Sequence, residues 1–321
     1  MRRLLWPLNP VYAASVAAKN VAYDRGWLKT KRTQWPVVSV GNLSAGGSGK
    51  TPFVIALAKL LVRNGVQADV LSRGYGRSAD AIEKVNPSGD AARSGDEPLL
   101  IAQSAGVPVY VGADRYEAGL VAEKNESGPR IHLLDDGFQH RRLARDLDIV
   151  LLHRTDFSES LLPVGNLREP LSALRRASAV VLRQEDAAFE ENLRERGIEA
   201  PVWLIRRVMN VPFDAGRVVA FCGIARPGEF FSLLRANGAE VADTLAFRDH
   251  HRYTEDDLKR LIGLAKSAKA DAFLTTEKDS VRLPQEMKER LSAVAPLRLV
   301  PLETRFEDMS AVLKKVLPLA G

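Results

Sequence analysis

The sequence predicts an α/β fold with a mostly parallel sheet, a second and smaller α/β domain, and an N-terminal amphipathic helix. Three observations support this prediction. Short β-branched runs alternate with helical patterns between residues 36 and 210, as they do in parallel sheets with crossover helices. A glycine-rich segment follows the first of these runs, at residues 44–51. A basic and amphipathic stretch precedes it, within residues 1–35.

The first 35 residues form a basic arm on an otherwise neutral chain. Seven basic residues and one acidic residue give residues 1–35 the whole of the formal net charge of +6. Apolar residues accompany them, namely Leu4, Leu5, Trp6, Leu8, Tyr12, Val16, Tyr23 and Trp27. This combination predicts an arm that associates with an anionic membrane surface; a helix docked on its own domain is the alternative. Because the rest of the chain is neutral, no nucleic acid partner is expected.

The composition is that of a folded protein in a reducing compartment. Hydrophobic residues make up 45% of the 321 residues and charged residues 27%, as in ordinary globular domains. No run of about 18 apolar residues occurs, so no membrane-spanning helix is expected. Cys222 is the only cysteine, which excludes an intrachain disulfide, and its apolar neighbours indicate a buried thiol.

The larger domain is expected at residues 36–210. Its strands are predicted at 37–40, 69–72, 107–111, 131–134, 149–152 and 179–182. Helical patterns lie between several of them, at 52–64, 98–105, 115–123 and 171–176. This order predicts a mostly parallel sheet flanked by helices.

The smaller domain is expected at residues 211–321, closing over the nucleotide cleft. Strand-like runs at 202–206 and 218–221 are separated by Asn210, Pro212 and Gly216, which are typical of a linker. Further helices are predicted at 228–237 and 255–268, and further strands at 241–247, 272–275 and 297–300.

The glycine-rich segment predicts a phosphate-binding loop, and with it a sheet of the P-loop NTPase type. Its residues are Ser44, Ala45, Gly46, Gly47, Ser48, Gly49, Lys50 and Thr51. Glycines let successive backbone N–H groups surround phosphate oxygens, and the following helix adds its positive end. Lys50 would reach the β- and γ-phosphates, and the Thr51 hydroxyl would bind Mg²⁺. Ser44 replaces the first glycine of the general pattern, so we expect a variant loop.

Two aspartates, Asp135 and Asp136, end the apolar run at 131–134. A P-loop requires a carboxylate on a neighbouring strand to hold Mg²⁺ or its water. Adjacent side chains of a strand point to opposite sides, so one aspartate would serve the metal and the other a hydrogen bond or the substrate. An ordinary Asp-Gly turn is the alternative.

Three other polar segments are weaker signals. Asp96 opens a predicted helix, where it is either a functional carboxylate or a simple capping residue. Arg73 lies in a glycine-rich turn that could bring a guanidinium group to phosphates. His250 and His251 are adjacent and lack the partner spacing of a zinc site, so we expect no zinc there.

Together these segments resemble the tetraacyldisaccharide 4′-kinase family of lipid A biosynthesis. The matching motifs run in order over some 240 residues: SVGNLS (39–44) leading into GGSGKTP (46–52), SRGYG (72–76), GDEP (95–98), LDDGFQH (134–140), LREP (167–170), DHH (249–251) and TTEKD (275–279). Each motif alone is weak, but the ordered set is highly specific. Ser44 departs from the general P-loop pattern, but it resembles the loop of this family at that position.

The resemblance implies an activity and a set of site residues. The activity is transfer of the ATP γ-phosphate to the 4′-hydroxyl of a tetraacylated glucosamine disaccharide 1-phosphate, which gives lipid IVA. The catalytic group would consist of Asp96, His250 and Lys50. The positions near the metal would be Thr51, Asp135, Asp136, Gln139 and Glu169, and Arg73 and Arg168 would lie near substrate or phosphate charge.

The resemblance also implies a place and partners for the protein. ATP and Mg²⁺ would be its cofactors, and its acylated disaccharide substrate would keep it at the cytoplasmic face of the bacterial inner membrane as a peripheral protein. No obligate protein partner is evident. A P-loop has two alternative interpretations: a non-catalytic GTP- or ATP-dependent switch or metallochaperone, and a ligase for a small soluble acid. The guanine-reading pattern Asn-Lys-x-Asp does not occur in the sequence.

Overall fold

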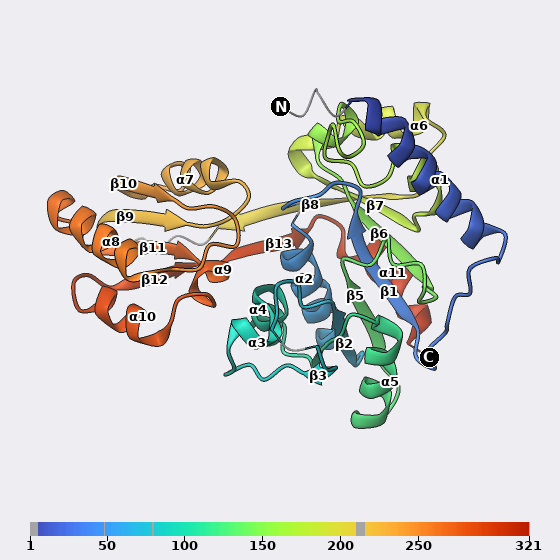
Figure 1. The fold of residues 1–321 in the computed structure, drawn as a ribbon, viewed down its shortest axis with the longest axis horizontal. Coiled ribbons are helices and arrows are strands. Elements are labelled where there is room, and N and C mark those ends of the chain that lie inside the picture. Colours follow the sequence, from blue (N-terminus) through green and yellow to red (C-terminus); the bar gives the residue numbers. More distant parts are fainter. Residues whose placement is uncertain (1–5, 48, 79, 210–215, 321) are drawn as a thin grey trace.

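The computed structural model describes residues 6–47, 49–78, 80–209 and 216–320, which build two sheets side by side (Figure 1). The large sheet has the strand order β13-β8-β7-β6-β1-β5-β2-β4-β3. Its strands are β1 (Val37–Asn42), β2 (Ala68–Ser72), β3 (Glu83–Lys84), β4 (Val109–Val111), β5 (Ile131–Asp135), β6 (Leu147–Leu151), β7 (Ala179–Arg183), β8 (Val202–Met209) and β13 (Leu302–Phe306). The central strands are parallel, and β3 and β13 pair antiparallel with their neighbours at the two edges. The expected mostly parallel α/β sheet is confirmed.

Helices cover both faces of the large sheet, which explains its continuous apolar strands. They are α2 (Lys50–Arg63), α3 (Ala91–Ser94), α4 (Asp96–Ser104), α5 (Arg115–Asn125), α6 (Phe189–Glu195) and α11 (Met309–Val316), with short 3₁₀ helices at Arg154–Phe157, Leu171–Arg176 and Gln184–Asp186. Strands buried on both faces read as near-continuous hydrophobic runs. Every residue of β1 is buried, and α2 packs Phe53, Leu57 and Leu61 against this core.

The small sheet has the order β10-β9-β11-β12 and is parallel throughout. Its strands are β9 (Arg217–Cys222), β10 (Glu240–Ala246), β11 (Ala272–Thr276) and β12 (Leu297–Val300), and its helices are α7 (Pro227–Ala236), α8 (Glu255–Ala268), α9 (Glu277–Ser280) and α10 (Gln285–Ser292). Phe230 of α7 and Leu258 of α8 belong to separate apolar clusters of this sheet. Cys222 is buried, as expected, and burial raises the pKa of its thiol to about 12.

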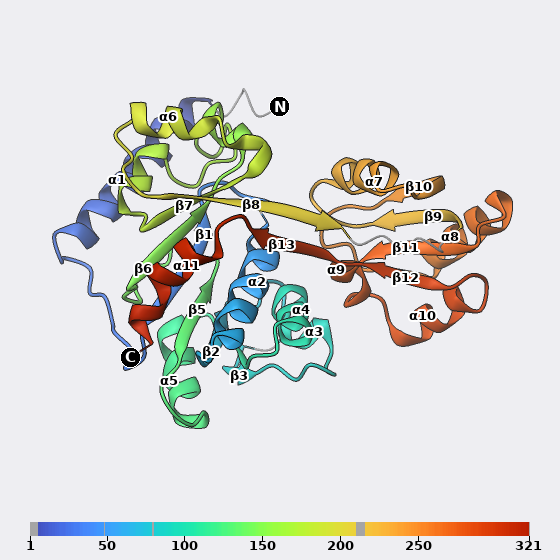
Figure 2. The same cartoon turned by 180° about the vertical axis from the view of Figure 1, so that it is seen from behind.

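The end of the chain returns to the large sheet, which the expected division at residue 211 did not anticipate. β13 pairs with β8, and both strands run between the two sheets (Figure 2). Val312 and Val316 of α11 are buried in the core beneath the large sheet. The local pattern of a strand does not specify which sheet it joins, and this explains the difference. The expected linker residues Asn210 and Pro212 lie outside the described residues.

The expected N-terminal helix is α1 (Asn9–Asp24), and it lies along the side of the large domain (Figure 1). The Tyr12 hydroxyl donates to the Arg168 carbonyl at 3.1 Å, and the Asn20 amide donates to Glu169 at 2.8 Å. No residue of α1 is buried, although these contacts attach it to the domain. Among the described residues, no helix combines the length and the apolar character needed to cross a bilayer.

Candidate active site

The phosphate-binding loop lies between β1 and α2, as predicted. Gly49 precedes α2 with φ +88°, and Gly46 has φ +114°, so both occupy backbone conformations that favour glycine. A side chain at position 49 would also collide with the Arg207 guanidinium. Ala45, Gly46, Gly47, Gly49, Lys50 and Thr51 all line one cavity, while Ser44 pairs in a bridge with Leu167 outside it. Ser48 lies outside the described residues.

Lys50 points toward the acidic end of β5. Its ammonium group lies 3.0 Å from the Asn42 side-chain oxygen and 3.4 Å from Asp136. Arg168 contacts the other side of the Asp136 carboxylate at 2.9 Å. Burial alone would raise the pKa of Asp136, but Lys50 and Arg168 hold that pKa below its usual value. Asp136 is therefore an ionised group between two cations.

The neighbouring Asp135 has a different environment. It is buried, and the Ser72 hydroxyl donates to its Oδ2 at 3.2 Å. Burial and the nearby carboxylates Glu97 and Asp136 raise the pKa of Asp135 to about 7. Its Oδ1 is buried without a hydrogen-bond partner among the described residues. Asp136 follows the end of β5 with φ +53°, so the two aspartates are not neighbours on an extended strand, and both line the same cavity. The division of labour between them stays a prediction.

Asp96 and His250 come together from the two domains. Asp96 begins α4, and its Oδ2 lies 3.1 Å from the His250 Nδ1. The Asp96 side chain caps no helix, so the capping alternative is wrong. Burial raises the pKa of Asp96, but His250 and Arg282 outweigh that effect and lower the pKa below its usual value. The site therefore presents an ionised carboxylate beside an imidazole.

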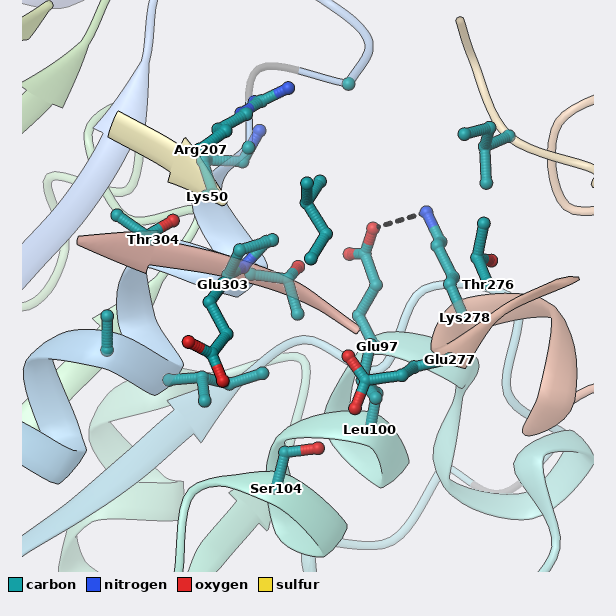
Figure 3. Close-up of a pocket in the computed structure, with 18 of the residues that line it drawn as sticks. Lys50, Glu97, Leu100, Ser104, Arg207, Thr276, Glu277, Lys278, Glu303 and Thr304 are labelled. Atoms are coloured by element: carbon teal, nitrogen blue, oxygen red, sulfur yellow. Dashed lines mark hydrogen bonds and ion pairs between the residues drawn. The ribbon is translucent and has the colours of Figure 1, made fainter. Parts of the chain in front are cut away.

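A cavity of about 1040 Å³ lies between the two sheets; among the described residues, Asp96 does not line it, whereas its partner His250 does. Its walls come from the phosphate-binding loop, α2, α7, α9 and β13, so both domains contribute. Figure 3 shows Lys50 and Arg207 on one side and the Lys278–Glu97 ion pair, 2.9 Å long, on another. His250, Asp135 and Asp136 also line this cavity.

Residues 1–318 match the family model described as tetraacyldisaccharide-1-P 4′-kinase. The chain belongs to this kinase family. It is 47% identical over 322 residues to the tetraacyldisaccharide 4′-kinase of Koribacter versatilis, covering 97% of each chain. It is 40% identical to the enzyme of the same name from Aquifex aeolicus, covering 88% of this chain and 90% of that one.

A solved structure of the same kinase family has the same fold. The crystal structure of LpxK from Aquifex aeolicus in complex with ATP superposes with a TM-score of 0.79 at 33% sequence identity. The match covers 100% of this chain and 99% of that chain. This kinase is therefore an ATP-dependent enzyme of lipid A biosynthesis, and the comparisons do not favour the switch, metallochaperone or ligase readings.

Four other predicted site residues lie in different surroundings. Arg168 and Arg73 line the cavity. Gln139 donates to the Asn42 carbonyl at 2.9 Å and accepts from Arg168 at 3.1 Å. Glu169 is buried on the side of α1, where Arg176 contacts it at 3.0 Å. Gln139 supports the loop through Asn42, and Glu169 connects α1 to the domain.

Sequence reasoning missed two arginines that approach the site. Arg207, at the end of β8, lines the cavity beside the phosphate-binding loop, and burial and Arg183 lower its pKa to about 10. Glu229 of α7 lies 3.9 Å from Arg207 and 3.4 Å from Arg183. Arg282 contacts Asp96 from the small domain. In the sequence, each of these arginines is recognisable only as a charged residue within an apolar segment, and this does not indicate which residue it contacts.

Proposed function

We propose that this kinase transfers the ATP γ-phosphate in line to the 4′-hydroxyl of its disaccharide substrate, with Asp96 as the base and His250 as its partner. One observation carries the assignment: the phosphate-binding loop and His250 line one cavity between the two domains, and Asp96 contacts His250 at 3.1 Å. General base catalysis requires the base within hydrogen-bond reach of the reacting proton. A sugar hydroxyl bound next to the Asp96–His250 pair, at the edge of this cavity, would satisfy that requirement.

The remaining catalysis would come from positioning and charge neutralisation. Lys50 and the loop amides would hold the β- and γ-phosphates, and the positive end of α2 would add to their field. A carboxylate with a pKa of about 4 is a weak base toward an alcohol. It suffices when the proton moves late, as in a loose phosphoryl transfer.

The residues around Asp135 fit Mg²⁺. The buried Asp135 Oδ1 has no hydrogen-bond partner among the described residues, and Thr51 lines the same cavity as Asp135. Mg²⁺ commonly combines one or two carboxylates with substrate phosphates and waters. The ion would neutralise charge on the phosphates, and Asp136 would keep Lys50 and Arg168 in place.

Substrate charge would be received by Arg73 and Arg168. Arg73 is exposed at the rim of the cavity, where it could meet the phosphate of the disaccharide. Arg168 contacts Asp136 and Asn42, so it would influence the substrate mainly through its position next to the loop. Arginine suits both roles because its planar guanidinium binds phosphate with two donors.

The arm would attach the enzyme to the membrane that contains its substrate. Trp6, Val11 and Trp27 of the arm are 72%, 65% and 69% exposed, so their apolar side chains are accessible to a membrane. Basic residues surround them in the sequence. Such a surface would partition into the headgroup region of an anionic bilayer. We therefore propose peripheral binding at the cytoplasmic face of the inner membrane.

The Asp96→Asn variant tests the assignment of the base. We expect kcat to fall by about 10²- to 10⁴-fold, which is the usual contribution of a general base. ATP binding, measured by calorimetry, should stay within about twofold of wild type because Asp96 is not part of the phosphate-binding loop. Near-wild-type turnover by a folded Asp96→Asn protein would contradict the assignment.

A further inference from the structure

Arg282 connects both members of the proposed catalytic pair. Its Nε donates to Oδ2 of Asp96 at 2.5 Å, and one terminal nitrogen lies 3.3 Å from Nδ1 of His250. The other terminal nitrogen donates to the Gly223 carbonyl at 2.6 Å. The side chain is only 3% exposed, although it carries a full charge. A buried arginine with three such contacts is held in one orientation.

The small domain fixes Arg282 through a fully buried carboxylate, Asp279. That carboxylate lies 3.4 Å from the guanidinium. It also accepts hydrogen bonds from the Gly223 N–H at 2.8 Å, the Tyr253 hydroxyl at 2.9 Å and the Thr276 hydroxyl at 2.6 Å. These donors come from separate segments of the small domain. Buried polar networks that are fully satisfied are rigid, so Asp279 sets the position of Arg282.

The contacts at Asp96 use one of its two oxygens. Both His250 and Arg282 contact Oδ2, and among the described residues no hydrogen bond is made to Oδ1. A carboxylate oxygen that is already bonded to a guanidinium is a poorer proton acceptor than a free one. Oδ1 is therefore the oxygen left to accept a hydroxyl proton.

We propose that Arg282 is a positioning residue that fixes the Asp96 carboxylate against His250 and leaves Oδ1 directed to the substrate. This inference rests on the proposed role of Asp96. It gives the small domain a direct part in the reaction, because Arg282 lies 186 residues from Asp96 and reaches it across the domain boundary. Arg282 is not among the described residues that line the cavity, so it would act through its contact with Asp96.

The charges around Asp96 give this role a measurable pH signature. The groups that face it are His250 and Arg282, and beyond them Lys278 neutralises Glu97 and lies 3.9 Å from Asp249. Arg282 helps to lower the pKa of Asp96. Removal of the guanidinium raises that pKa, so the fraction of ionised base at low pH decreases. The acid limb of kcat/KM should therefore move to higher pH.

The experiment compares Arg282→Gln and Arg282→Lys with a matched control, Arg290→Gln. Arg290 lies in the same domain and pairs at the surface with Glu255. We expect Arg282→Gln to lower kcat by about 10²-fold, as a small misplacement of a reacting group does, and to shift the acid limb upward. Arg282→Lys should keep the acid limb near that of wild type and still lose kcat, because an ammonium group lacks the planar fork. Arg290→Gln should match wild type in kcat and in the position of the acid limb.

Asp96→Asn separates this inference from the proposed function. An inactive Asp96→Asn with a wild-type kcat and pH profile for Arg282→Gln would refute only the role of Arg282. An active Asp96→Asn variant would refute the assignment of Asp96 as the base. If thermal unfolding shows that Arg282→Gln does not fold, Arg282→Lys decides: a wild-type kcat would overturn the proposal, and a lowered kcat with an unmoved acid limb would support it.

Discussion

At the scale of single residues, Gly49 illustrates how backbone geometry and charge meet at the phosphate-binding loop. Its φ of +88° lies in the left-handed region, and the space where a Cβ would stand is filled by the guanidinium of Arg207. Glycine therefore allows two things at once: the turn into α2 and the close approach of a cation to the loop. Both favour bound phosphate, since they leave backbone N–H groups and positive charge at one place.

Gly49→Ala should weaken ATP binding while the protein remains folded. An alanine at position 49 would relax out of the left-handed conformation in the free protein, and its return on ATP binding would cost about 1–2 kcal/mol, so we expect a Kd for ATP about tenfold or more above wild type. Gly263→Ala is the control, because a Cβ at position 263 of α8 would meet nothing within 4 Å. Equal ATP affinity for the Gly49 variant and wild type in calorimetry would contradict this account of the loop.

The sequence was informative about residues whose role is local. The loop, Asp135 and Asp136 were predicted because a strand, a turn and a helix follow one another in the chain. Arg282 was not predicted, since its role depends on a contact with Asp96 across 186 residues. Glu169 was expected near the metal, but its contacts are with Arg176 and Asn20 on the side of α1. Such long-range partners cannot be read from spacing.

At the scale of elements, α8 begins with a capping box that also holds the loop of His250 and His251. The Asp257 carboxylate accepts from the Thr254 N–H at 2.9 Å and from His251 at 2.8 Å. Burial raises the pKa of Asp257, but the hydrogen bonds from His251 and Thr254 outweigh burial and bring the pKa below its usual value. The start of α8 is therefore stabilised by an ionised Asp257.

Asp257→Ala should lower the free energy of unfolding by about 1–2 kcal/mol at pH 7, the usual cost of a lost cap. Because the folded pKa is depressed, the stabilisation is complete above the unfolded pKa of about 4 and is lost as the pH falls through the folded pKa. Urea unfolding at several pH values measures this difference. The exposed neighbour Asp256→Ala should change little, and a pH-independent difference for Asp257→Ala would contradict the account.

The N-terminal arm, which contains α1 and the preceding Trp6, carries a second prediction at this scale. Replacing Trp6 and Val11 together by serine should weaken binding to phosphatidylglycerol vesicles by about tenfold or more, because each buried apolar side chain contributes about 1.5–3 kcal/mol. Sedimentation measures the bound fraction. Val294→Ser, which changes an exposed apolar residue of the small domain, serves as the control. Equal sedimentation of the arm variant and wild type would show that α1 only docks on its own domain.

At the scale of the whole molecule, two connections join the domains around one cavity. The strands β8 and β13 pair with each other and lead into and out of the small domain (Figures 1 and 2). Ion pairs add further contacts, with Lys278 reaching Glu97 and Arg282 reaching Asp96. The small domain therefore contributes one of the two proposed catalytic groups, His250, and the residue that we propose positions both.

The alternation of strands and helices predicted both sheets, but it did not predict how the chain divides between them. The periodic runs of the central strands and of α2 and α8 were sufficient, since their apolar faces follow from local spacing. The two-residue strand β3 has too little pattern to be recognised. The return of β13 and α11 to the large sheet depends on pairing with β8, which lies about 100 residues earlier. Pairings at such a distance leave no local signal.

The central claim is that ATP and an acylated disaccharide phosphate bind at this cavity and that the γ-phosphate passes from one to the other. The most direct measurement is the rate of ADP formation by wild-type enzyme with and without tetraacyldisaccharide 1-phosphate in mixed micelles, using ATP and GTP in parallel. We expect the lipid to increase ATP turnover by at least about 100-fold, since productive transfer requires the positioned hydroxyl. A rate that is unchanged by the lipid, or a matching rate with GTP and no lipid phosphorylation, would contradict the account.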